Sequence, residues 1–122
     1  MVTINSNEYS KICKELFSLS ETVQIATQPE FVIFSVEGEV GSGSVKLGHN
    51  DGDKKEEQTL LEVTEPVTQQ FALRYLNMFN KAAALSSFTR LCLHQEQPLV
   101  VEFKIDNLGV LKYFLAPKIS DE

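Results

Sequence analysis

The segment Leu99–Pro117, LVVEFKIDNLGVLKYFLAP, contains two stretches in which apolar and polar residues alternate, joined by a short turn. This alternation is typical of antiparallel strands that bury one face, so the segment predicts a hairpin. An apolar Ala-Pro-Lys-Ile step, residues 116–119, follows the second strand. Because Pro117 and Ile119 lie past the strand pattern, we expect a small exposed patch that docks a partner segment. The alternative for Phe114, beside them, is that it completes the core.

The rest of the chain predicts a mixture of helices and short strands. Apolar residues recur at helical spacing over Glu8–Ser20, with Asn7 as the expected N-cap. A second helix is expected over Ala72–Ala83, burying Ala72, Leu76 and Phe79. The polar segment 50–58 predicts a loop. Strands are expected at residues 22–27, 30–37, 40–49, 59–63, 88–95, 98–105 and 109–116.

The order of these elements, strand, helix and three strands, occurs twice with an offset of roughly 66 residues. Phe31–Phe34 in the first half lies where Leu99–Glu102 recurs in the second. We therefore predict a single α+β domain over residues 1–122. Its two βαβββ repeats would be related by a pseudo-twofold axis, with two helices packed on one side of antiparallel sheet.

Charge is distributed unevenly along the chain. The net charge of −6 argues against binding to nucleic acid. However, residues 66–95 contain no carboxylate but do contain Arg74, Lys81 and Arg90. One part of the surface is therefore expected to be positive.

The two predicted helices each present a polar line. Lys11, Lys14 and Ser18 share one face of the first helix, and Arg74, Asn77 and Lys81 share one face of the second. If the helices lie side by side, the two lines form a single basic strip. The alternative is that both are ordinary solvated helix faces.

The sequence gives no support to an enzyme. It has no P-loop, no G-x-S-x-G and no H-E-x-x-H motif, and His49 and His94 are isolated from other ligand-type residues. Cys13 and Cys92 lie in apolar patterns, so we interpret both as buried, reduced side chains and not as a disulfide. No apolar run approaches the roughly 20 residues of a membrane span. We expect no catalytic residue, metal, cofactor or membrane association.

Several blocks of the sequence resemble the C-terminal domain of the eukaryotic DNA sliding-clamp family, proliferating cell nuclear antigen. They cover essentially the whole chain. A subunit of this family carries two such domains, so the resemblance implies that residues 1–122 are the C-terminal half of a subunit. The blocks are EYSKICKELFSLSETVQIA (8–26), FSVEGEVGSGSVKL (34–47), EPVTQQFALRYLNMFNKA (65–82), LSSF (85–88) and PLVVEFKIDNLGVLKYFLAPKI (98–119).

The resemblance implies a nuclear, non-enzymatic processivity factor for DNA replication and repair, in which three subunits form a ring around duplex DNA. The implied partners are duplex DNA, bound without sequence preference, and polymerases, ligases, nucleases and clamp-loader proteins that dock through short peptide motifs. The resemblance also implies that Lys11, Lys14, Arg74 and Lys81 face DNA. It assigns Ala72, Tyr75, Pro98, Phe114, Ala116, Pro117 and Ile119 to the client-peptide pocket, and Gly43, Ser44, Val45, Lys46 and Leu47 to a subunit-interface strand.

The chain departs from the family pattern in three respects. Phe114 stands where a tyrosine is common, and Ser18 where some members have a histidine. The N-terminal domain and its connector, which forms the other pocket wall, are not part of this chain. We therefore expect the isolated chain to bind client peptides poorly, and its edge strands could drive self-association. An alternative function is a diverged clamp-like checkpoint or adaptor subunit that binds peptides without forming the replication ring.

Overall fold

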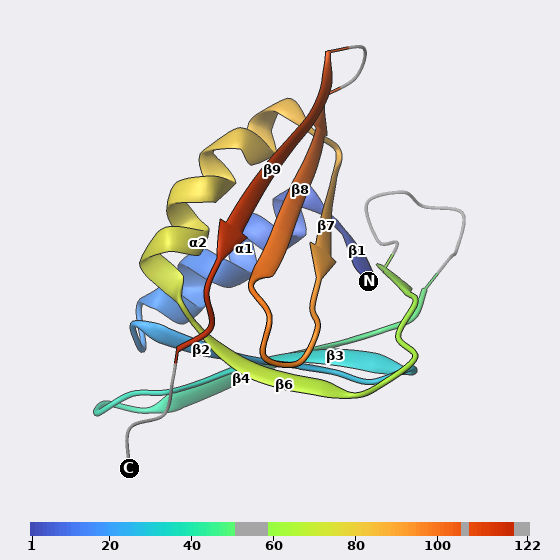
Figure 1. Cartoon of the computed structure of the whole chain (residues 1–122). Coiled ribbons are helices and arrows are strands. Elements are labelled where there is room, and N and C mark those ends of the chain that lie inside the picture. The colour runs from blue at the N-terminus through green and yellow to red at the C-terminus, as the bar shows by residue number, and fades with distance from the viewer. Residues whose placement is uncertain (51–58, 106–107, 119–122) are drawn as a thin grey trace.

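The strands form two antiparallel sheets in the computed structural model, which describes residues 1–50, 59–105 and 108–118 (Figure 1). Sheet A has the order β5-β1-β7-β8-β9, and sheet B has the order β4-β3-β2-β6. The strands are β1 (Val2–Asn5), β2 (Thr22–Thr27), β3 (Phe31–Glu37), β4 (Ser42–Gly48), β5 (Thr59–Leu61), β6 (Val67–Ala72), β7 (Phe88–Cys92), β8 (Leu99–Ile105) and β9 (Gly109–Leu115). The predicted α+β class is confirmed, and the expected loop at 50–58 lies outside the described residues except for Asn50.

Each repeat gives its first strand to the sheet of the other repeat. β1 pairs with β7 in sheet A, and β6 pairs with β2 in sheet B. The two repeats are therefore β1-α1-β2-β3-β4 and β6-α2-β7-β8-β9. The prediction that residues 59–63 begin the second repeat is wrong, because β5 is a short additional strand at the edge of sheet A and β6 precedes the second helix.

Helix α1 (Ser6–Phe17) begins two residues before its predicted start. The predicted N-cap Asn7 is wrong: the cap is Asn5, whose side-chain oxygen accepts a hydrogen bond from the backbone N–H of Glu8 at 3.1 Å. Asn7 already lies in the first turn. The helix buries one apolar face, as its spacing predicted, and that face consists of Tyr9, Ile12, Cys13 and Leu16.

The second helical segment differs from its prediction in start and type. Ala72 ends β6 and is not in the helix; α2 spans Leu73–Phe79, and a 3-10 helix, η2, spans Asn80–Leu85. Leu76 is buried as predicted, whereas Phe79 is only half-buried and stacks on Tyr113 with 4.6 Å between ring centroids.

The core lies between the helices and the inner faces of both sheets. Both helices lie on the same side of the β7–β9 strands (Figure 1). The largest fully buried side chains are Tyr9, Phe34, Phe71 and Phe103, contributed by one helix and both sheets, so a single core joins the two repeats. Among the described residues, no helix is long and apolar enough to cross a membrane.

Candidate functional site

A pocket of about 430 Å³ lies where β6 ends, α2 begins and the chain leaves β9. It brings together three of the residues assigned to a peptide pocket, Ala72, Tyr75 and Ala116, from three separate segments. We call it the docking pocket. Its other lining residues are Glu21, Arg74, Leu115 and Lys118.

The remaining predicted pocket residues lie around this space. Phe114 is 65% exposed, so it does not complete the core. Its backbone is opposite Val100, on the face of sheet A turned away from the helices. Pro98 is exposed at the same end of the sheet and Pro117 is half-buried, but neither lines the docking pocket. Ile119 lies outside the described residues.

The segment after β9 is held against sheet B. The backbone N–H of Lys118 donates to the carbonyl oxygen of Gln70 at 2.7 Å, and its ammonium donates to the hydroxyl of Thr22 at 2.5 Å. This crossing fixes Ala116 next to the end of β6. The pocket therefore depends on the contact between the two sheets.

Arg74 lies at the rim of the docking pocket. Its guanidinium is 4.7 Å from the centre of the Tyr75 ring and donates to the phenol oxygen at 2.8 Å. Because the guanidinium stacks on the ring, it holds Tyr75 in place and gives the pocket a cationic side. The same side chain was assigned to the DNA-facing strip, so Arg74 links the two candidate surfaces.

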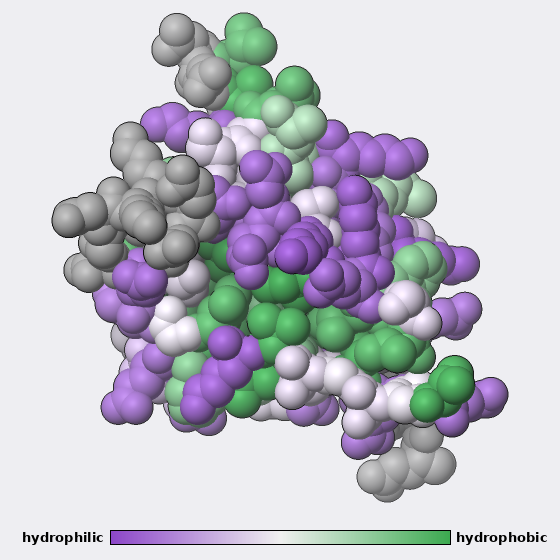
Figure 2. Space-filling view, turned by 180° about the vertical axis from the view of Figure 1, so that it is seen from behind, coloured by the Kyte–Doolittle hydropathy of each residue, from purple (hydrophilic) through white to green (hydrophobic). Residues whose placement is uncertain are grey.

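The other three residues predicted to face DNA lie on the surface of the helices. Lys11, Lys14 and Lys81 are exposed, but Glu8 and Glu15 are exposed on α1 as well. From behind, a hydrophilic band lies over α1 in the middle of the molecule, with apolar surface below it on the side of sheet B (Figure 2). α2 and η2 contain no carboxylate. The surface is therefore positive on its second helical segment and of mixed sign on its first.

Asn77 was predicted in the exposed polar line, and this is wrong. It is half-buried, and its amide donates to the carbonyl oxygens of Cys13 at 3.3 Å and Leu73 at 3.1 Å. The first of these bonds joins α1 to α2, so Asn77 holds the two helices side by side. The sequence did not reveal this contact, because Asn77 is polar and shares a helix face with Arg74 and Lys81, a pattern that is typical of solvent-exposed residues.

A buried polar cluster lies behind this contact. Burial raises the pKa of the Cys13 thiol to about 11, and it raises the pKa of the Tyr9 phenol well above its ordinary value. The Asn80 side chain is buried beside the Cys13 thiol, and its contact with the thiol opposes the rise in the thiol pKa. At neutral pH the Cys13 thiol is therefore a weaker nucleophile than an exposed cysteine.

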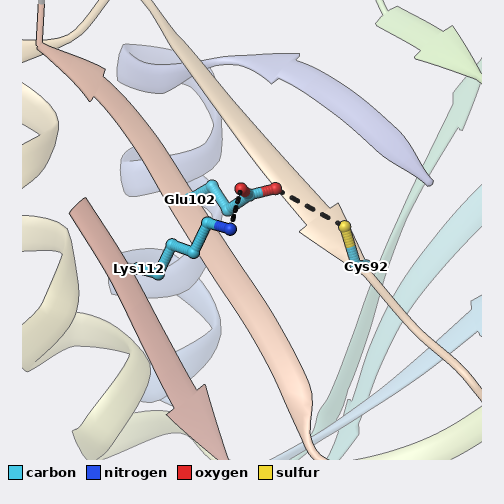
Figure 3. Close-up of polar contacts among 3 residues, drawn as sticks. All are labelled: Cys92, Glu102 and Lys112. Atoms are coloured by element: carbon cyan, nitrogen blue, oxygen red, sulfur yellow. Dashed lines mark hydrogen bonds and ion pairs between the residues drawn. The ribbon is translucent and has the colours of Figure 1, made fainter. Parts of the chain in front are cut away.

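Cys92 differs from its prediction. Both cysteines are free thiols, and Cys13 is buried as expected, but Cys92 is only half-buried. Its thiol donates to the Glu102 carboxylate at 3.7 Å, on the outer face of sheet A (Figure 3). Burial and the adjacent Glu102 charge raise its pKa.

The predicted subunit-interface residues Gly43–Leu47 lie in β4. This strand is the last of sheet B and pairs with β3 on one side only. A Cβ at Gly43 would be 2.9 Å from the end of the Leu19 side chain, so β4 passes close to the residues that follow α1. The other edge of β4 remains open among the described residues.

In a comparison with protein-family models, residues 1–118 match the family described as "Proliferating cell nuclear antigen, C-terminal domain". The match covers nearly all of the 122 residues and both repeats. It agrees with the two helices and two antiparallel sheets described above. The chain therefore belongs to the family of proliferating cell nuclear antigen C-terminal domains, which has the sliding-clamp fold and consists of non-catalytic processivity factors of DNA replication.

Proposed function

We propose that this chain is the C-terminal half of a clamp subunit whose homotrimeric ring encircles duplex DNA in the nucleus and docks replication and repair proteins. The observation that carries the proposal is the docking pocket, in which Ala72, Tyr75 and Ala116 come together from β6, α2 and the segment after β9. An exposed pocket with apolar walls and one cationic side suits a short client peptide with apolar anchors.

DNA contact is assigned to the helical surface. Sliding needs attraction to phosphates without base readout, which exposed lysines provide. Lys11, Lys14 and Lys81 meet this requirement, and Lys81 is not opposed by any carboxylate on its own helical segment. Arg74 contributes to DNA binding only in part, because its guanidinium is engaged by Tyr75.

DNA contact is tested by titrating the chain with a short duplex while recording amide NMR spectra at two salt concentrations. We expect salt-sensitive shifts at the amides of α1 and η2, because counterion release makes phosphate binding weaken with salt. Lys81→Glu should reduce them more than Lys46→Glu, a matched reversal on β4. Shifts confined to sheet A would overturn the assignment.

Docking is tested on the two-domain parent with a synthetic peptide that presents an aliphatic and an aromatic anchor in a short turn. Ala72→Asp should abolish binding, because it places a charge in the apolar pocket. Ala84→Asp is the matched control, since Ala84 is exposed on η2, away from the pocket. Equal binding by both variants would refute the pocket.

Assembly is assigned to sheet edges. Of the four edges, β5 is only three residues long, and β6 is covered by the hydrogen bond from Lys118 to Gln70. These are common ways to block unwanted pairing. β4 and β9 have seven residues each and no such protection among the described residues. In the parent ring β4 would pair with the neighbouring subunit, and in the isolated chain both edges are free to self-associate.

Light scattering of the isolated chain over a range of concentrations tests this assignment. Ser44→Lys on β4 and Val110→Lys on β9 should lower the average mass, because both residues are exposed on open edges. Thr68→Lys, exposed on the covered edge β6, is the matched control. A monomer at every concentration would remove self-association.

The alternative, an adaptor subunit that docks peptides without a replication ring, is favoured by one observation. Glu8 and Glu15 are exposed on α1 and offset the charge of Lys11 and Lys14. A clamp-loading assay on the two-domain parent separates the two functions. A parent that docks peptides but never becomes linked to circular DNA would be an adaptor.

A further inference from the structure

The outer face of sheet A, which is turned away from both helices, has a groove of about 490 Å³ beside the β8–β9 turn. We call it the outer-face groove. It lies at the opposite end of β9 from the docking pocket, near Val110 and not near Ala116. Apart from Val110, which also lies on the open edge strand β9, its lining residues have no part in the proposed clamp function. The side chains important here are Phe88, Arg90, Glu102, Lys104 and Val110, with the hydroxyl of Thr3 at one side.

Arg90 lies in this groove without an acidic partner, although an acid is next to it. In the sheet register Arg90 on β7 is directly opposite Glu102 on β8, and Glu102 is directly opposite Lys112 on β9. Glu102 has other partners: one carboxylate oxygen is 3.6 Å from the Lys112 ammonium on β9, and the other accepts from the Cys92 thiol on β7 at 3.7 Å (Figure 3). Each carboxylate oxygen therefore has a partner other than Arg90.

Within residues 1–50, 59–105 and 108–118, Arg90 and Lys104 form no ion pair. Both are exposed. An arginine fork that is fixed on a strand and lacks its own carboxylate is suited to binding an incoming carboxylate through two parallel hydrogen bonds. The local excess of cations stands out on a chain whose net charge is −6.

Apolar side chains lie next to these cations. Val110 is directly opposite Lys104, and Phe88 is on the neighbouring strand β7. Val110 is 52% exposed and Phe88 is half-buried. The groove is of the size that binding sites usually have, which is about 300–1,000 Å³. It therefore combines an apolar floor with a cationic side.

We propose that the outer-face groove binds an acidic segment of a partner protein that carries an apolar side chain. The apolar side chain packs on Phe88 and Val110, and a neighbouring carboxylate pairs with Arg90. Charge complementarity with Arg90 and Lys104 favours an acidic segment, and the apolar side chains beside them favour a peptide over a phosphate backbone. This interaction does not involve the docking pocket.

The probe is a fluorescent peptide in which phenylalanine and leucine alternate with aspartate. Its fluorescence, as the full chain is titrated, measures the affinity, which should fall with rising salt. In NMR spectra of the chain we expect the peptide to shift the amides of β7 and of the β8–β9 turn. Arg90→Glu should weaken binding about tenfold or more, and Arg90→Lys should weaken it less, because charge remains but the fork is lost. A peptide with asparagine in place of aspartate should bind weakly.

Lys112 provides a sharper test, since it does not line the groove. Lys112→Met should weaken peptide binding, because the released Glu102 can then turn to Arg90. Glu102→Gln should strengthen it. Tyr75→Ala, in the docking pocket, should leave it unchanged and so separates this proposal from the proposed function.

Several results would overturn the proposal. They are no binding at millimolar peptide, binding that Arg90→Glu leaves intact, or shifts that map to the docking pocket. Preferential binding of single-stranded oligonucleotide at the same residues would replace the peptide with a nucleic acid.

Discussion

At the scale of single residues, the start of α1 shows how little separates two plausible caps. Asn5 and Asn7 are both asparagines next to the first turn, and only the structure shows that Asn5 accepts from Glu8. We expect Asn5→Ala to lower the free energy of unfolding by about 1 kcal/mol, because an amide of the first turn loses its partner. Asn7→Ala, the matched control, should change it by less than about 0.5 kcal/mol. Urea unfolding of both variants measures the difference.

The thiol of Cys13 makes stability depend on alkaline pH. Its pKa is raised from 9.0 to about 11 by burial, so the folded state holds the proton more tightly than the unfolded state. The resulting stabilisation is complete below about pH 9 and is lost as pH rises through 11, a loss of about 2–3 kcal/mol. The high pKa of Tyr9 adds to the decline.

Thermal unfolding between pH 8 and pH 11 checks this dependence. We expect the difference in stability between the wild-type chain and Cys13→Ala to shrink across that range, because the variant keeps only the Tyr9 contribution. A difference independent of pH would contradict the raised thiol pKa.

Gly38 illustrates a close approach between a turn and a helix end. A Cβ at this position would lie 1.8 Å from the carbonyl oxygen of Leu19, whereas a Cβ at Gly41 would have no atom within 4 Å. We therefore expect Gly38→Ala to cost about 1–3 kcal/mol through displaced backbone, and Gly41→Ala to cost far less. Denaturant midpoints of the two variants test this. Equal midpoints would mean that the turn yields without cost.

At the scale of elements, the strands with regular alternation could be predicted, and β6 could not. Its buried positions are Val67, Gln69 and Phe71. A glutamine at the central buried position breaks the apolar alternation. The structure explains it: the Gln69 amide donates to the His94 carbonyl oxygen at 2.9 Å and accepts from the Glu96 amide at 3.1 Å. This polar tie is tertiary, so local sequence gives no sign of it.

β7 ends at Cys92 and not at Gln95 as predicted. A turn follows it, in which the Gln97 N–H donates to the His94 carbonyl oxygen at 3.1 Å and Glu96 has a left-handed φ of 64°. In the candidate surfaces, too, local spacing predicted some side chains correctly and failed where a tertiary contact decides. Helix spacing predicted exposed Lys11 and Lys14, but it placed Asn77 in solvent, because the contact between α1 and α2 is not visible in one helix.

At the scale of the whole molecule, the docking pocket has only the walls that this domain supplies. Tyr75 is half-buried and Ala116 is exposed, so much of the apolar surface faces solvent. We expect the isolated chain to bind a client peptide much more weakly than the two-domain parent does. A peptide that is covered on one side buries less apolar surface than one held between two walls, so its binding free energy is smaller.

Isothermal titration calorimetry of one peptide against both proteins makes this comparison. Micromolar binding by the isolated chain would show that the domain carries a complete site. Phe114→Tyr is a useful companion variant, because its side chain is 65% exposed and the added hydroxyl meets water without a folding penalty.

The exchange of first strands between repeats has a consequence for biosynthesis. During translation β1 leaves the ribosome well before its partner β7, which spans Phe88–Cys92. Sheet B likewise waits for β6 on one side of β2. Neither repeat can complete its hydrophobic interior until the strands of the other repeat have left the ribosome, so the nascent domain exposes apolar surface to chaperones until then.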